Sequence, residues 1–171
     1  WIVTNGQYTI SDIGNDWTSG ISTIGDTAWT NYVIKATVDL QPFCGSNRAA
    51  ALVRVQDSKN FLAFKIHDGG ECFSSNAVNY AAWYVVKNSE WVEISNTRYE
   101  DYPHGEPFIL TVQVEGNLIT TYLNNEQILS FSDASFSAGK VGLFLESSTA
   151  LISRAQPATL DDFSVVAVPA P

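Results

Sequence analysis

The sequence predicts an all-β protein, a two-sheet antiparallel β-sandwich of the jelly-roll type. The main observation is that apolar and polar residues alternate with a period of two along most of the chain, between turn-forming segments at regular spacing. The second is size, because 171 residues with 45% hydrophobic content suit one domain with a substantial core. The third is the lack of any amphipathic helix or fixed-period repeat, which argues against helical folds, propellers and solenoids.

Alternation and turn residues define the expected strands. Gly116–Asn117 and Asn124–Asn125 predict two-residue hairpin turns, because both residue types tolerate positive φ. Two segments show an inward set clearly: Tyr32, Ile34, Ala36, Val38 and Leu40 in one, and Phe108, Leu110, Val112 and Val114 in the other. The expected strands are 6–10, 20–24, 31–40, 49–56, 61–67, 80–87, 91–96, 107–115, 118–123, 126–132, 140–146, 149–154 and 160–167.

The domain is expected to cover residues 1–168, and the tail 169–171 reads as the start of a linker. We interpret the chain as a mature or excised segment, since it opens with Trp1 rather than Met. The apolar runs are too short to cross a bilayer. A net charge of −9 argues against nucleic acids and anionic lipid surfaces as partners.

The two cysteines indicate an oxidising compartment. If residues 57–60 form a hairpin turn, the pairing carried outward places Cys44 within about one position of Cys72. Such cross-strand neighbours suit a disulfide bond, so we expect a Cys44–Cys72 bridge and secretion. Two buried free thiols are the alternative.

The hairpin at 52–66 carries cationic side chains in an acidic protein. Its expected core side consists of Val53, Val55, Leu62, Phe64 and Ile66. The opposite side then holds Arg54, Gln56, Phe61 and Lys65. This side is either an ordinary solvated face or a concave surface on which Arg and Lys bind carboxylated or sulfated sugars.

A second hairpin places tryptophans on a polar face. If residues 88–90 form the turn, Tyr84 and Val86 face the core, and the opposite side holds Trp83, Lys87, Trp91 and Glu93. The tryptophans either lie under a covering loop or form a platform for sugar rings. The following polar loop, 95–107, adds Tyr99 as a binding candidate, although an ordinary strand connection explains it as well.

Several segments carry a family resemblance: "WTSGISTIGDTAWTNYVIKATV", "AALVRVQDSKNFLAFKIHDG", "LTVQVEGNLITTYLNNEQIL" and "FSAGKVGLFLESS" followed by "ATLDDFSVVAV". Their succession resembles the concanavalin A-like lectin/glucanase superfamily, and most of all the laminin G-like jelly-roll modules attached to secreted polysaccharide-degrading enzymes. The enzyme motifs of that superfamily are missing. No strand carries Glu-X-Asp-X-X-Glu or Gln-X-His, and Ala63 stands where the branch resembling 3-keto-disaccharide hydrolases has an acid.

The resemblance also implies a structural calcium ion near the last strand. Asp161 falls on the core side of that strand, where a carboxylate needs a partner. Oxygen ligands from Asp161, Asn5 and Asp39 would suit calcium. An aspartate paired with backbone N–H groups at the strand start is the alternative.

These observations favour a non-catalytic carbohydrate-binding module that recognises a polysaccharide or oligosaccharide, acidic sugars included. The expected ligand-binding residues are Arg54, Gln56, Lys65, Trp83, Lys87, Trp91, Glu93 and Tyr99. A polysaccharide lyase or glycoside hydrolase is the first alternative, although hydrolysis needs paired carboxylates that the strands lack. A laminin G-like protein-adhesion domain is the other.

Overall fold

The structure is a computed structural model that describes residues 2–4, 7–9, 18–40, 46–68, 80–94, 98–101, 103, 106–148 and 158–168. The regular elements within these residues are all β-strands. They are β1 (Ile2–Thr4), β2 (Gln7–Thr9), β3 (Thr18–Ile24), β4 (Tyr32–Asp39), β5 (Ser46–Asp57), β6 (Asn60–Asp68), β7 (Tyr80–Lys87), β8 (Glu90–Glu93), β9 (Phe108–Glu115), β10 (Leu118–Leu123), β11 (Glu126–Ser132), β12 (Lys140–Ser148) and β13 (Thr159–Ala167).

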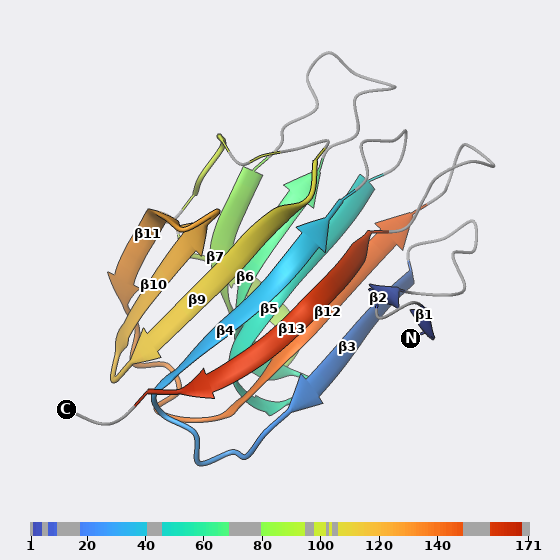
Figure 1. Ribbon diagram of the computed structural model, residues 1–171. Helices are drawn as coiled ribbons and strands as arrows, with labels where there is room; N and C mark the ends of the chain where they lie inside the picture. Colours follow the sequence, from blue (N-terminus) through green and yellow to red (C-terminus); the bar gives the residue numbers. More distant parts are fainter. Residues whose placement is uncertain are drawn as a thin grey trace.

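Antiparallel pairing joins these strands into two sheets. The first sheet has the order β1-β2-β13-β4-β9-β10-β11, and the second has the order β3-β12-β5-β6-β7-β8. Figure 1 shows the two sheets as stacked layers, with β4, β9 and β13 in front of β5, β6 and β12. The predicted two-sheet sandwich is therefore confirmed. Among the described strands only β1 was not expected, and the expected strand 149–154 lies outside the described residues.

The core lies between the two sheets and uses every second residue of each central strand. The expected inward residues are buried in both segments. They are every second residue from Tyr32 to Leu40, along β4 and just after it, and every second residue from Phe108 to Val114 in β9. The second sheet contributes Val53, Leu62, Phe64 and Ile66, also as expected. Alternation predicts this correctly because neighbouring side chains of a strand point to opposite faces of the sheet.

Two-residue turns with positive φ close two of the hairpins. Asn124 and Asn125, at φ 48° and 68°, join β10 to β11 as predicted. Asn88 and Ser89, at φ 52° and 70°, join β7 to β8, where a three-residue turn was expected. The shorter turn changes the pairing register of that hairpin by one residue, and it therefore changes which side chains share a face.

A bulge interrupts the β5–β6 hairpin. The register shifts between Val53 and Asp57, and Arg54 takes a φ of 52°. Gly139 lies against the Arg54 backbone so closely that a Cβ there would sit 2.3 Å from the Arg54 carbonyl carbon. The bulge turns the Arg54 side chain away from the face to which strict alternation assigned it.

The described residues include no helix that could span a membrane.

Candidate functional site

The outer face of the second sheet gathers charged and aromatic side chains from neighbouring strands. Register places Glu146, Arg48, His67 and Tyr80 side by side on β12, β5, β6 and β7. We call this surface the concave face. Its residues are Arg48, Lys65, His67, Tyr80, Tyr84, Trp91, Glu93, Phe144 and Glu146, with Arg98 at the rim.

The contact between Trp91 and Phe144 shows that this face is concave. Trp91 lies on β8 and Phe144 on β12, four strand positions apart in the sheet. In a flat sheet their backbones would stand about 19 Å apart, at about 4.8 Å per strand. The two ring centroids nevertheless lie only 5.4 Å apart. The sheet must therefore curl toward this side, so that β8 at one edge and β12, next to the other edge, bring their side chains together.

A small apolar cluster forms the floor of the concave face. It consists of Ala50, Leu52, Val55, Phe61, Ala63, Val86 and Phe144, all buried. Trp91 covers it and meets Phe61 edge to face at 5.5 Å between ring centroids and Tyr84 at 5.7 Å. Because the indole is half-buried and held on several sides, it presents a fixed and only partly open surface.

Lys65 stands at the centre of this face among aromatic and acidic groups. Its Nζ lies 4.5 Å from the centroid of the Trp91 ring and 5.3 Å from that of Phe144. The same atom is 3.4 Å from Oε2 of Glu146, which also accepts a hydrogen bond from Arg48 Nη1 at 2.6 Å. Burial lowers the Lys65 pKa, and Glu146 opposes that shift. The Glu146 carboxylate therefore pairs with both Lys65 and Arg48.

A second polar group lines the β7–β8 edge. Arg98 donates to both carboxylate oxygens of Glu93, at 3.1 and 2.9 Å from Nη2, and its guanidinium carbon lies 4.0 Å from the Tyr80 ring centroid. Tyr84 donates its hydroxyl to Glu93 Oε2 at 3.1 Å. Burial is the main cause that raises the Tyr84 pKa, and the neighbouring Tyr80 and Glu93 add to it. The Tyr84 hydroxyl therefore acts as a hydrogen-bond donor.

His67 lies between these groups and is neutral at pH 7. Its ring stacks near Tyr80 at 5.0 Å between centroids. Burial, together with the positive charges of Arg48 and Lys65, lowers its pKa to about 4. A neutral imidazole has one donor and one acceptor nitrogen, so it can donate a hydrogen bond to one hydroxyl group and accept one from another.

The structure brings together three of the predicted ligand-binding residues, Lys65, Trp91 and Glu93. The other five lie elsewhere. Trp83 was expected on this face, but it is fully buried between the sheets, where its Nε1 donates to Thr121 Oγ1 at 2.9 Å. The two-residue turn pairs Val86 with Trp91 and Tyr84 with Glu93, so Trp83 falls on the opposite side from Trp91.

Arg54 was also predicted wrongly as a surface residue. The bulge buries it completely, and its guanidinium donates to the backbone carbonyls of Gly116, Asp133 and Phe136. Gln56 follows the same distortion and donates to the carbonyl oxygens of Arg54 and Ala138, at the end of the hairpin.

Lys87 and Tyr99 lie away from the concave face as well. Lys87 is exposed near the β7–β8 turn, with Nζ 5.8 Å from the Phe136 ring centroid. Tyr99 forms a backbone bridge to Ala81 and packs against the core between the sheets, so its neighbour Arg98 is the one that reaches the rim.

The proposed calcium ligands are only partly described. Asp161 Oδ1 accepts the backbone N–H of Asp162 at 2.7 Å, which is the pairing that the sequence left open as an alternative. Asp39 pairs with Thr159 across the β4–β13 ladder, and Asn5 lies outside the described residues. No group of three or more His, Cys, Asp or Glu side chains in the described ranges could hold a metal ion. Cys44 and Cys72 also lie outside those ranges.

Sequence reasoning missed several residues of the concave face, among them Arg48, Tyr80, Phe144 and Glu146. A signal was present. Glu146 ends the run Val141–Leu145 at the same parity as Phe144, and Arg48 shares parity with Leu52. The contact between Arg48 and Glu146 could not be predicted from either strand alone, because β5 and β12 are far apart in the chain and adjacent only in the sheet.

Comparison with known proteins supports the fold. No family model and no curated protein matches the chain. Among solved structures, the carbohydrate-binding module CBM66 from Bacillus subtilis matches with a TM-score of 0.62 and 16% identity, over 94% of each chain. The CBM2 module of the evolved Dit protein of Lactobacillus casei BL23 phage J-1 matches with a TM-score of 0.67 and 15% identity, over 95% of this chain and 76% of that one.

A toad ovary galectin, solved in complex with thio-digalactose, matches with a TM-score of 0.57 and 13% identity over 86% of this chain and 98% of that one. This chain shares the two-sheet β-sandwich fold of these modules and of the galectin. At these identities the likeness concerns the fold, because unrelated functions occur on the same fold.

Proposed function

We propose that the protein is a non-catalytic carbohydrate-binding module that holds a glycan on the concave face. The observation that carries this proposal is the Lys65 ammonium between the Trp91 ring and Glu146, with Arg48 on the same carboxylate. Partly open aromatic rings beside fixed hydrogen-bonding groups suit a sugar, which has apolar C–H faces and polar edges. The solved carbohydrate-binding modules and galectins of the same fold support this class of ligand.

The charge balance of the face favours acidic sugars. Three of the nine basic residues of the chain lie here, Arg48, Lys65 and Arg98, whereas the whole chain carries a net charge of −9. Two carboxylates, Glu93 and Glu146, oppose them. A ligand carboxylate or sulfate would meet an excess of positive charge at this place, and Arg presents a planar fork that fits such groups.

The same contacts argue against catalysis at this face. Each of the two carboxylates is bound by a cation, whereas a glycoside hydrolase needs one carboxyl group that donates a proton to the leaving oxygen. A lyase would need a base, and Tyr84 is poorly suited to that role because its pKa is raised and its proton is donated to Glu93.

Binding to a panel of acidic and neutral polysaccharides tests the proposal. Retention in affinity electrophoresis is expected with acidic polymers such as polygalacturonate, alginate or chondroitin sulfate, and it should weaken with added salt. Lys65→Met should reduce the affinity at least tenfold, whereas the matched control Lys87→Met, an exposed lysine outside the face, should not change it.

Equal retention of both variants would contradict the proposed site. The appearance of new reducing ends or unsaturated uronates would instead identify an enzyme, and binding to extracellular proteins without glycan retention would identify an adhesion domain.

Secretion, the Cys44–Cys72 disulfide and a structural calcium ion complete the proposal. They rest on the spacing of the cysteines and on the position of Asp161, together with the resemblance to secreted modules. The same resemblance supports the proposal that the chain is part of a larger multidomain secreted protein.

A further inference from the structure

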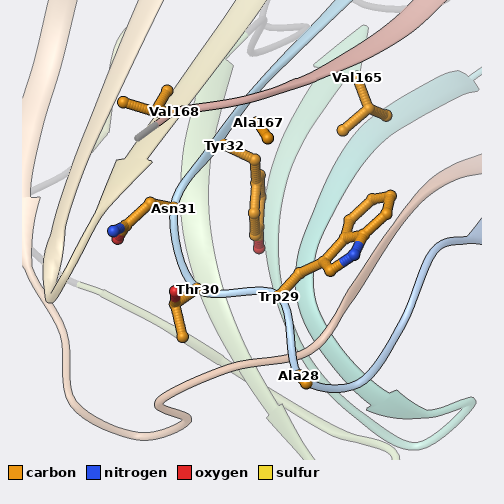
Figure 2. Close-up of a pocket in the computed structure, with 8 residues that line it drawn as sticks. All are labelled: Ala28, Trp29, Thr30, Asn31, Tyr32, Val165, Ala167 and Val168. Carbon is orange, nitrogen blue, oxygen red and sulfur yellow. The ribbon is translucent and has the colours of Figure 1, made fainter. Parts of the chain in front are cut away.

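A pocket of about 460 Å³ opens beside the segment 28–32, away from the concave face. Its walls come from that segment and from the end of β13. Figure 2 shows the Trp29 indole next to the Tyr32 ring, with Val165 and Ala167 on the neighbouring strand. Both β4 and β13 belong to the first sheet, whereas the concave face belongs to the second.

Hydrogen bonds fix the segment that forms this pocket. Asp26 accepts the backbone N–H of Ala28 at its Oδ1 and that of Trp29 at its carbonyl, at 2.8 and 3.2 Å. Gly139 donates to the Trp29 carbonyl at 3.0 Å, and Val168 donates to that of Asn31 at 3.2 Å. The pocket is therefore preformed, and a ligand would not have to order the loop on binding.

The Trp29 side chain is held in place while a large part of it stays open to solvent. It is 37% exposed, and Gly25 lies so close to its six-membered ring that a Cβ there would be 2.4 Å from Cζ3. Gly25 has a φ of 99°, so glycine is the natural residue there. A side chain at Gly25 would therefore displace the indole from this position.

The chemistry of the lining is polar on one side, apolar on the other, and uncharged. The apolar wall consists of the indole with Val165, Ala167 and Val168. Within the described part of the chain, the Trp29 Nε1 and the Thr30 hydroxyl have no hydrogen-bond partner. The Asn31 amide accepts the Gly116 N–H at its Oδ1 at 2.8 Å and keeps its Nδ2 for a ligand.

Tyr32 is the lining residue that can ionise, and it remains neutral. Its hydroxyl points inward and accepts the backbone N–H of Arg54 at 3.0 Å. Burial raises its pKa to about 12. The lining therefore offers no charge with which to select an ionic ligand.

We infer that this pocket is a second saccharide site, which takes one neutral sugar residue with a ring face on the Trp29 indole. The volume lies at the small end of the range for small-molecule pockets, about 300–1,000 Å³, and so suits a single ring. A hydroxyl group of the sugar would accept from the Trp29 Nε1, at the edge of the same indole. The site differs in charge from the concave face, so one module would bind a neutral residue at one place and an acidic stretch at another. The binding of an acidic stretch on the concave face rests on the proposed function, whereas the neutral site at Trp29 does not.

Nuclear magnetic resonance on the ¹⁵N-labelled full chain can test this site directly. The probes are the methyl glycosides of glucose, galactose, mannose, xylose and fructose, with methyl galacturonide as the acidic probe and cyclohexanol as the apolar probe. At least one neutral glycoside should shift the Trp29 indole and Asn31 amide signals saturably, with the Trp91 indole signal unchanged. Trp29→Ala should weaken that binding at least tenfold and leave retention of acidic polysaccharides intact.

A matched pair of glycine variants separates the ring position from backbone strain. Gly25→Ala should abolish the binding because it displaces the indole. Gly116→Ala, also at positive φ but with open space around its Cβ, keeps the backbone N–H that Asn31 accepts and should keep the binding. The inference is overturned if no neutral glycoside shifts Trp29, if cyclohexanol alone does, or if Trp29→Ala binds normally. Loss of acidic-polysaccharide retention in Lys65→Met tests the proposed function of the concave face and does not bear on the Trp29 site.

Discussion

Replacing Arg54 with Met tests the most consequential correction to the sequence-based expectation. The arginine was expected to contact sugar, yet its guanidinium is buried and donates to carbonyls from two separate segments, at Gly116 and at Asp133 and Phe136. Burial lowers its pKa, while Tyr32 and Asp133 partly oppose this shift. The side chain therefore fastens the β9–β10 turn and the β11–β12 connection to the bulge in β5.

The expected loss of stability follows from these three acceptors. A hydrogen bond from a charged group contributes about 1.5–3 kcal/mol, but the three act as one unit and do not simply add. Arg54→Met leaves these carbonyls without their donor at about 1–3 kcal/mol each, less than additively, so the free energy of unfolding should fall by about 3–5 kcal/mol. For a chain of this size, with about 2–4 °C per kcal/mol, the melting temperature should fall by roughly 6–20 °C.

Urea unfolding followed by tryptophan fluorescence measures this change. The midpoint should fall with little change in the m-value, because the surface exposed on unfolding stays nearly the same. Arg98→Met is the matched control: its ion pair with Glu93 is partly exposed, so its effect on stability should stay within about 1 kcal/mol. Below its melting temperature, Arg54→Met should still retain glycan, with a much smaller loss of affinity than Lys65→Met. Unchanged stability together with lost glycan binding would refute the structural role.

The remaining predictions concern four other places. Trp83→Ala should lower the free energy of unfolding by about 3–5 kcal/mol in urea melts, because the indole fills the space between the sheets; a stable variant would contradict its burial. The folded state holds His67 neutral with a pKa of about 4, so stability should be complete above about pH 6.5 and fall toward pH 4. His67→Gln should flatten that profile in pH-dependent melts, and an unchanged slope would argue against it. EGTA should lower the melting temperature if Asp161 helps to bind calcium, and no shift would count against the ion. Intact mass with and without reductant should reveal the Cys44–Cys72 bridge, and equal masses would exclude it.

The fold could be predicted from the sequence because it depends on a local pattern repeated many times. In β4 and β9 each inward residue is followed by an outward one, and burial follows the same alternation. Errors at strand ends, as in β5 and β8, do not change the number of layers. An average over many residues therefore identifies a sandwich even when single positions are wrong.

The candidate site depends on single positions, and there the same reasoning fails. With a three-residue turn, Trp83 and Trp91 would share a face. With the two-residue turn at Asn88 and Ser89, Tyr84 and Trp91 share it and Trp83 enters the core. Both Asn-Ser and Asn-Ser-Glu are plausible turn sequences, so composition does not distinguish them. A difference of one residue in a turn therefore reverses which tryptophan can meet a ligand.

Curvature is the second property that a linear pattern cannot supply. Trp91 and Phe144 are in contact across three intervening strands, although the sequence of neither strand predicts this contact. The bulge at Arg54 increases the local twist of β5, as bulges do, and it lies at the end of the hairpin that runs through the middle of the second sheet. The buried arginine and the concave face are thus linked: a residue that touches no sugar would still shape the surface that does. Arg54→Met should for this reason loosen the Trp91–Phe144 contact, detectable as a change in near-ultraviolet circular dichroism that Lys87→Met, at an exposed lysine outside the concave face, does not produce.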